Sequence, residues 1–232
     1  MSKMMECKNL CKDYGNVLAL DQVNISLESG RIVGLLGPNG SGKTTLLKIA
    51  NGLLVPSAGE ILLDGHRPGK ESKAIVSYLP DASYLPAWMN IDGLVGMFDD
   101  FYSDFDEKKA REMLVSLGLK ENARLKTLSK GNKEKVQLIL AMSRQAKIYF
   151  LDEPIGGVDP AARDYILNTI IQNYSENALV VLSTHLIADI ERVLDEVVFL
   201  NQGKVMCHRE VDEIRETEGK SVDELFREVF RC

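Results

Sequence analysis

The sequence lacks any apolar run long enough to cross a bilayer. No stretch of its 232 residues approaches the ~20 consecutive apolar residues that a membrane-spanning helix needs. The first residues, MSKMME, also lack the apolar segment of a secretory signal peptide. We therefore expect a chain that lies outside the bilayer and that depends on a membrane partner for any role in a membrane process.

Cysteine is scarce and scattered. The four cysteines are Cys7, Cys11, Cys207 and Cys232. No pair of them has the spacing of a zinc site, and isolated thiols of this kind are typical of reduced cysteines in a cytosolic protein. We therefore expect neither disulfide bonds nor structural zinc.

An excess of basic residues is also missing. Lys and Arg together number 28 against 34 Asp and Glu, which gives a formal net charge of -6. Surfaces that bind nucleic acid usually show as a basic face or a high pI, so we expect no nucleic-acid partner, although the net charge leaves room for a local basic patch. With 45% hydrophobic residues, the chain can bury one substantial core.

The order of strand and helix patterns predicts a parallel α/β fold. Residues 23–27 alternate apolar and polar, and residues 31–36 form a nearly continuous apolar run, as expected of a strand buried on both faces. A glycine-rich loop and a helical pattern over residues 44–54 follow, with Gly52 as the predicted stop of the helix. Two more buried strands are predicted at 148–151 and 179–182. A strand, a glycine-rich loop and a helix in this order begin a parallel α/β unit.

The pattern becomes helical between residues 84 and 145. Polar-rich segments with helical spacing occupy residues 107–117 and 132–143, which predicts a helical insertion into the α/β core. Near the C-terminus, Ser221 and Glu224 have the spacing of a capping box, which predicts a short amphipathic helix over residues 221–230.

The glycine-rich loop carries a phosphate-binding motif. It matches G-x-x-x-x-G-K-[ST] with Gly37, Pro38, Asn39, Gly40, Ser41, Gly42, Lys43 and Thr44. Glycines let the backbone curl so that N–H groups point inward, and the helix N-terminus adds positive potential. We expect Lys43 to reach the β- and γ-phosphates of a nucleotide, Thr44 to bind Mg²⁺ through its hydroxyl, and Thr45 to line the same site. The strand before the motif and the helix after it argue against a chance glycine-rich turn.

An acidic pair follows the predicted strand at residues 148–151. Because a buried strand delivers Asp152 to its C-terminal end, this carboxylate is suited to coordinate Mg²⁺, and the adjacent Glu153 to polarise an attacking water as a general base. Such a pair taken alone is usually a solvated strand end. When the acidic pair follows the phosphate-binding loop (the P-loop, residues 37–44) in this chain order, it indicates a site that hydrolyses nucleotides.

Five further segments resemble motifs of the ATP-binding cassette (ABC) family, in that family's order. Residues 128–132 (LSKGN) resemble the ABC signature, usually written LSGGQ. Residues 157–159 resemble the D-loop, and His185 stands where the family has its switch histidine. Tyr14 resembles the aromatic residue of the A-loop, and residues 78–81 (YLPD) resemble the Q-loop. The resemblance covers essentially the whole chain.

The resemblance implies the fold and the division of the chain. Members of the family have a P-loop NTPase (RecA-like) α/β core with an antiparallel N-terminal β-subdomain and a helical subdomain. We therefore expect a single nucleotide-binding domain over residues 1–232. Its core would comprise residues 1–81 and 147–232, and its helical subdomain residues 82–146.

The resemblance also implies a Mg²⁺-dependent ATPase that works as a dimer. Each ATP would lie between the P-loop of one subunit and the signature of the other. There, Ser129 and the amide of Gly131 would contact the γ-phosphate, with Asp159 at the same interface. A monomer would then carry two half-sites and hydrolyse little ATP.

Further site residues follow from the same resemblance. Tyr14 would stack on adenine, and His185 would act in hydrolysis with Lys43 and Glu153. Asp81 would approach the γ-phosphate and Mg²⁺. The implied cofactors are ATP and Mg²⁺.

The implied partners are a polytopic membrane permease on a separate chain and a second cassette, either identical or paralogous. The expected location is cytoplasmic, at the inner face of the cell membrane through the permease. The LSKG-type signature is similar to that of the drug- and antibiotic-export group, which favours an exporter. Two alternatives remain open: a soluble ABC ATPase that acts on nucleic acid or the ribosome, and a regulatory cassette that binds ATP but hydrolyses it weakly.

Three sites depart from the family pattern. Asp81 stands where glutamine is usual, and its carboxylate adds negative charge near the γ-phosphate. In the signature, Lys130 replaces glycine and Asn132 replaces glutamine, so that Lys130 adds positive charge beside the bound phosphates. Ile155 and Gly156 stand where a threonine and a small polar residue are usual.

Overall fold

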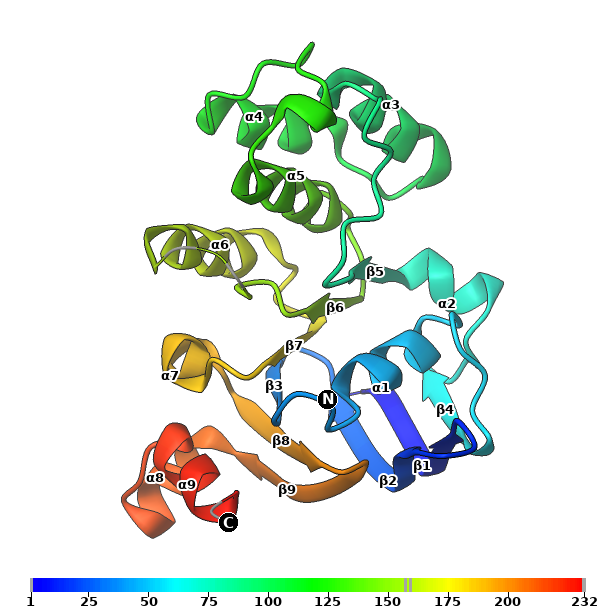
Figure 1. Cartoon of the computed structure of the whole chain (residues 1–232), viewed down its shortest axis with the longest axis vertical. Helices are drawn as coiled ribbons and strands as arrows, with labels where there is room; N and C mark the ends of the chain where they lie inside the picture. Colours follow the sequence, from blue (N-terminus) through cyan, green and yellow to red (C-terminus); the bar gives the residue numbers. More distant parts are fainter. Residues whose placement is uncertain (1, 157, 159, 231–232) are drawn as a thin grey trace.

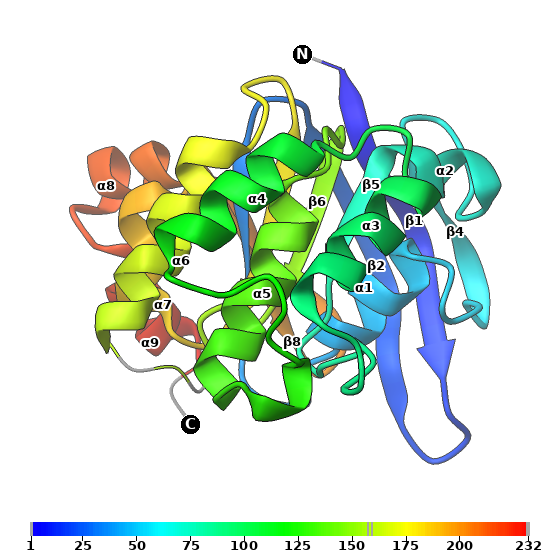
Figure 2. The same ribbon diagram turned by 90° about the horizontal axis from the view of Figure 1, so that it is seen from above.

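The computed structural model describes residues 2–156, 158 and 160–230. Figure 1 and Figure 2 show from two directions how its elements are arranged. Gly157 and Asp159, which belong to the predicted D-loop, lie outside the described residues. The described part contains two β-sheets with helices packed between and around them. This mixed α/β architecture confirms the predicted fold class.

The N-terminal sheet is antiparallel. It contains β1 (Lys3–Asp13), β2 (Leu18–Glu28) and β4 (Ala58–Leu63) in the order β2-β1-β4. The predicted strand at residues 23–27 is part of β2, where buried apolar side chains alternate with exposed polar ones. The antiparallel N-terminal sheet is therefore confirmed.

The second sheet is parallel apart from its last strand. Its order is β5-β6-β7-β3-β8-β9, and β9 runs antiparallel to β8. The strands are β3 (Ile32–Leu36), β5 (Val76–Leu79), β6 (Ile148–Asp152), β7 (Leu179–Thr184), β8 (Glu196–Asn201) and β9 (Lys204–Glu210). Every residue of β3, β6 and β7 is buried, as their continuous apolar sequences predict.

Two apolar layers cover the two faces of this sheet. Helix α1 (Lys43–Ala50) lies between the two sheets, where its Leu47 belongs to the same buried cluster as Phe150 of β6. Tyr149 and Leu151, the neighbours of Phe150, belong to the cluster on the opposite face, because successive strand residues point to opposite sides. The helices that contribute to this second cluster are α5 (Lys130–Met142), α6 (Pro160–Asn173), α7 (Ile187–Ile190), α8 (Val211–Glu218) and α9 (Val222–Val229).

The predicted helical insertion contains α3 (Ile91–Phe101), α4 (Glu107–Ser116) and α5, which lie together at the top of Figure 1. These helices share a third buried cluster. Helix α5 connects this cluster to the main core, because its Leu140 belongs to the third cluster and its Leu138 to the cluster on the face of the sheet opposite α1. Whether residues 82–146 form a separate subdomain stays a prediction.

Two other helix predictions differ from the structure only at their ends. Helix α1 ends at Ala50, earlier than the pattern over residues 44–54 suggests, and the chain then turns at Gly52, which has a φ of 66°. Helix α5 begins at Lys130, two residues before the predicted start at 132. The hydrophobic period locates a helix better than it locates its ends.

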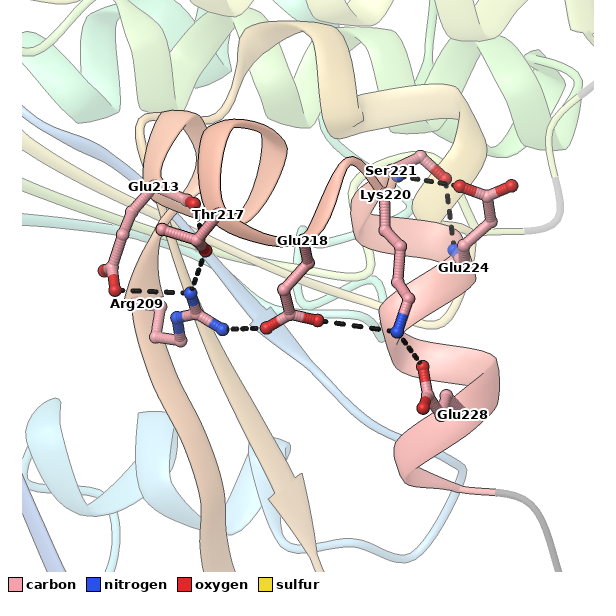
Figure 3. A network of polar contacts seen from close by, with 8 residues as sticks. All are labelled: Arg209, Glu213, Thr217, Glu218, Lys220, Ser221, Glu224 and Glu228. Carbon is pink, nitrogen blue, oxygen red and sulfur yellow. Dashed lines mark hydrogen bonds and ion pairs between the residues drawn. The ribbon is translucent and has the colours of Figure 1, made fainter.

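Ion pairs and aromatic packing fix the C-terminal helices. The predicted capping box is present, since Ser221 and Glu224 each accept from the other's backbone N–H. Arg209 of β9 pairs with Glu213 and Glu218 of α8, and Lys220 pairs with Glu218 and with Glu228 of α9 (Figure 3). Exposed ion pairs contribute little individually. The apolar contact lies beneath, where two rings of the C-terminal segment pack on Phe199 of β8.

Candidate functional site

The register of the parallel strands brings the predicted motifs to one edge of the sheet. Leu36, the last residue before the P-loop, pairs with Thr184 of β7, and Asp152 of β6 pairs with Ser183. The P-loop, the acidic pair and His185 therefore all begin where neighbouring strands end. Such an edge is where ligands bind in open parallel α/β sheets.

The P-loop wraps closely around the start of α1, and glycine is required at its two ends. A Cβ on Gly37 would come within 2.2 Å of the carbonyl oxygen of Leu200. A Cβ on Gly42 would come within 2.4 Å of the carbonyl oxygen of Ala19, and the φ of Gly42 is 110°. The loop from Asn39 to Thr45 lines a pocket of about 200 Å³ together with Ala19, Asp81 and Glu153.

Lys43 is buried at the base of this pocket. Its ammonium donates to the carbonyl oxygens of Gly37 and Pro38 at 2.8 and 3.2 Å and lies 3.9 Å from the Glu153 carboxylate. Burial lowers the pKa of Lys43, and the carboxylates of Glu153 and Asp152 oppose that shift. The neighbouring carboxylates thus help to keep the Lys43 ammonium charged in a pocket where it would bind phosphate.

Asp152 is almost fully buried, with 1% of its surface exposed. One carboxylate oxygen, Oδ1, accepts hydrogen bonds from the hydroxyls of Thr44, at 3.2 Å, and Ser183. The other oxygen, Oδ2, has no hydrogen-bond partner among the described residues. Burial raises the pKa of Asp152, the hydrogen bonds from Ser183 and Thr44 oppose the shift, and the charge of nearby Asp81 adds to it. A buried oxygen of this kind is suited to bind a cation.

Glu153 adopts a left-handed backbone conformation with a φ of 50°. Such a conformation costs a residue other than glycine about 1–3 kcal/mol and is often found at functional sites. Its amide donates to the carbonyl oxygen of Ser183 at 2.9 Å, and its carbonyl oxygen accepts from the amide of Gly156 at 2.9 Å. A Cβ on Gly156 would lie only 3.2 Å from the Cβ of Glu153. The glycine at this departure from the family pattern therefore leaves room for the Glu153 side chain.

The Glu153 carboxylate is held between two residues at the end of β7. The hydroxyl of Thr184 donates to Oε2 at 3.1 Å, and Nδ1 of His185 lies 3.1 Å from Oε1. His185 is exposed on its other side, with 44% of its side chain accessible. This contact brings His185 together with Glu153 and Lys43, the three residues that the family resemblance groups in hydrolysis.

The P-loop pocket is not lined by Tyr14, Ser129 or Gly131. Tyr14 is 53% exposed, with the ammonium of Lys12 5.1 Å from its ring centre. Ser129 caps the N-terminus of α5 by accepting from the amide of Asn132 at 3.3 Å, and Gly131 lies in the first turn of that helix. Asp159 lies outside the described residues.

The structure adds Ser183 and Thr184 to the site. Their hydroxyls bind Asp152 and Glu153, whereas the sequence reasoning used only the histidine that follows them. The sequence does contain a pattern that indicates these two residues. They end a predicted apolar strand, so their hydroxyls lie at the same edge of the sheet as the acidic pair.

No group of three or more His, Cys, Asp or Glu side chains within the described ranges is arranged to hold a metal ion. Mg²⁺ is commonly bound by one or two carboxylates together with water and substrate phosphates. The combination of Asp152 and Thr44 beside a P-loop fits that mode of binding.

A comparison with protein families now decides the identity. Residues 20–156 match the family model described as "ABC transporter". The chain belongs to the ABC transporter family. Among curated proteins, it is 32% identical to the uncharacterized ABC transporter ATP-binding protein YxlF of Bacillus subtilis, over 94% of this chain and 75% of that protein. It is 31% identical to the SkfA peptide export ATP-binding protein SkfE of the same organism, over 88% of each.

A solved structure supports the same assignment. The structure named "Structure of ATP binding subunit of ABC transporter" has a TM-score of 0.89 and 28% sequence identity, and the match covers 98% of this chain and 100% of that one. The chain is thus an ATP-binding subunit of the ABC type, an ATPase. No helix within the described residues is long and apolar enough to cross a membrane.

The buried, half-unpartnered Asp152 leads to a stability prediction. The folded-state pKa of Asp152 lies above its unfolded value, so ionisation disfavours the folded state at neutral pH but not below about pH 4. Asp152→Asn removes this penalty. Without Mg²⁺ and nucleotide at pH 8, its free energy of unfolding should exceed that of the unchanged protein by on the order of 1 kcal/mol, or about 2–4 °C in Tm.

Thermal denaturation followed by circular dichroism measures the difference. The gain should shrink as the pH falls toward 4 and the carboxyl of the unchanged protein is protonated. A variant that is less stable than the unchanged protein at pH 8 would contradict this electrostatic assignment.

Proposed function

We propose that the chain hydrolyses Mg²⁺-bound ATP at a site completed by a second cassette, and that it thereby drives a separate membrane permease in an export system. The observation that carries the hydrolytic part is the position of the Glu153 carboxylate. It is half-buried beside Lys43 and the P-loop, and its two oxygens are held by Thr184 and His185.

Thr44 and Asp152 are the residues that would hold Mg²⁺, with Asp81 near enough to line the same region. The unpartnered Oδ2 of Asp152 supports this assignment, because a buried acceptor is stabilised when it binds a cation or a hydrogen-bond donor. Bound Mg²⁺ would supply charge neutralisation for the phosphate oxygens. Lys43 would add a second positive charge beside the same phosphates.

Glu153 is placed to orient the attacking water. Its carboxylate lies at the edge of the pocket that the P-loop lines, so a water beside it would face the γ-phosphate end of a nucleotide. Nδ1 of His185 contacts the same oxygen of Glu153 that approaches Lys43. His185 can therefore fix the orientation of the base and sense whether a phosphate is present.

The exposed N-terminus of α5 supports a dimeric site. Ser129 is exposed, and it caps a helix of 13 residues. The N-terminus of such a helix attracts anions, but the P-loop pocket of the same chain is lined by other residues. A nucleotide held by a second cassette would supply the anion for Ser129 and Gly131.

The proposed transport role rests on the relatives. SkfE is named for peptide export, and the LSKG signature of this chain resembles that of export systems. The partner would be a polytopic permease, which would hold the chain at the cytoplasmic face of the membrane. A regulatory cassette with weak hydrolysis is distinguished from this proposal by the turnover of the assembled complex.

The role of Glu153 predicts the behaviour of Glu153→Gln. The amide keeps the size of the side chain but loses its basicity, so the variant should bind ATP and lose at least about 100-fold in turnover. It should also accumulate as an ATP-dependent dimer. Phosphate release and size-exclusion chromatography with ATP measure the two properties.

A control variant makes this test specific. Glu176→Gln removes an exposed carboxylate just before the N-terminal end of β7, whereas the site lies at the C-terminal end, and it should leave turnover unchanged. If Glu153→Gln hydrolyses ATP at the normal rate, Glu153 is not the base.

The transport role predicts a membrane partner. A tagged chain at its native level, purified from detergent-solubilised membranes, should retain a polytopic membrane protein that mass spectrometry identifies. Recovery of soluble or ribosomal partners alone would contradict the transport role and would leave the ATPase chemistry intact.

A further inference from the structure

Three buried oxygens without hydrogen-bond partners belong to residues around one small cavity between α5 and the end of β6. In the described part of the chain, six buried side-chain polar atoms lack a partner. Three of them are Glu134 Oε2, Gln137 Oε1 and Asp152 Oδ2, and all three residues line a cavity of about 20 Å³. Because a buried polar atom without a partner destabilises the fold, the position of three such atoms at one cavity indicates a site that receives a hydrogen-bond donor.

Gln137 is the unexpected member of this group. It lies in the third turn of α5 and is 3% exposed, between Val136 and Leu138, which are apolar and buried. An amide in such surroundings is unfavourable unless its polar atoms are bound. Nothing in the main-chain geometry of α5 requires an amide there, so the side chain has a role at the cavity.

The cavity has the size for about one water molecule. All three unpartnered atoms are oxygens, so what occupies it must donate hydrogen bonds. Mg²⁺ in proteins usually keeps several of its waters, and side chains that bind such waters orient the ligands of the ion. Gln137 is positioned for that task beside Asp152.

Asp81 lines the same cavity. It stands in the loop position where the family pattern has glutamine, whereas here the glutamine at the cavity comes from α5. We propose that Gln137 is a positioning residue for the magnesium site. Its amide oxygen accepts a hydrogen bond from a water in this cavity, and the same water orients the Asp152 carboxylate. Gln137 thereby supplies the uncharged amide that the family pattern has at the position of Asp81. This inference rests on the proposed magnesium site at Thr44 and Asp152.

The same face of α5 links this cavity to the signature. Lys130, Glu134 and Gln137 have the spacing i, i+4 and i+7, which places them on one face of the helix. Lys130 pairs with Oε1 of Glu134 at 3.7 Å, and the other oxygen of Glu134 is among the unpartnered atoms. Ser129, at the N-terminus of α5, would contact the nucleotide held by the second cassette. Gln137 lies about 12 Å farther along the axis of the same helix, at the metal site of the chain's own nucleotide.

The test is the Mg²⁺ dependence of nucleotide binding to Gln137→Met in the full chain. Methionine has nearly the same volume but no amide. Binding of a fluorescent ATP analogue is titrated with Mg²⁺, and binding with EDTA in place of Mg²⁺ is measured in parallel. We expect the Mg²⁺ concentration at half-saturation to rise about tenfold, with binding in EDTA unchanged.

Two further variants separate positioning from packing. Ser143→Ala removes another unpartnered buried oxygen, at the C-terminal cap of α5 and away from this cavity, and should leave the Mg²⁺ dependence unchanged. Adding Asp81→Gln to Gln137→Met returns an amide to the cavity from the loop. The double variant keeps the buried methionine, and its Mg²⁺ dependence should return toward that of the unchanged protein.

The outcomes are distinct. If the unchanged protein binds the analogue equally with Mg²⁺ and with EDTA, the proposed magnesium site fails and this inference with it. If the unchanged protein depends on Mg²⁺, then an equal Mg²⁺ dependence in Gln137→Met, or no recovery in the double variant, overturns the role of Gln137 alone.

Discussion

The parallel register of β3, β6 and β7 is the constraint on which the site depends. Three segments that are far apart in the chain leave the sheet at the same edge because Leu36 pairs with Thr184 and Asp152 pairs with Ser183. The strands themselves are fully buried, so the polar groups begin only where the apolar runs stop. A shift of one residue in this register would turn Asp152 to the other face of the sheet and away from Thr44.

Much of this arrangement can be predicted from the sequence. Buried strands appear in the sequence as continuous apolar runs, and local motifs predict Lys43, Asp152 and Glu153 as site residues. His185 follows only from the resemblance to the family. The contact between His185 and Glu153 could not be derived in this way, because it depends on the order of strands in the sheet. The resemblance to a known family grouped these residues in hydrolysis, and the structure supplies the strand order that brings them together.

Other features are not visible in any local pattern. The left-handed conformation of Glu153 follows from hydrogen bonds to Ser183 and Gly156, neither of which a single-sequence period can show. In the sequence, Gln137 is a single polar residue in an otherwise apolar stretch of α5, and this pattern indicates no role for it. Only the fold shows that Gln137 lines the same small cavity as the acidic pair. Helix ends were also less certain than helix positions, since capping depends on contacts outside the helix.

The central claim is that each catalytic site is divided between two cassettes, and mixing two inactive variants tests it most directly. Lys43→Ala disables the P-loop, and Ser129→Arg blocks the exposed signature. Each should hydrolyse almost no ATP alone. In a mixed dimer, one site carries both substitutions and the other carries neither, so mixing the two proteins should restore phosphate release. A mixture as inactive as its separate components would contradict the shared site.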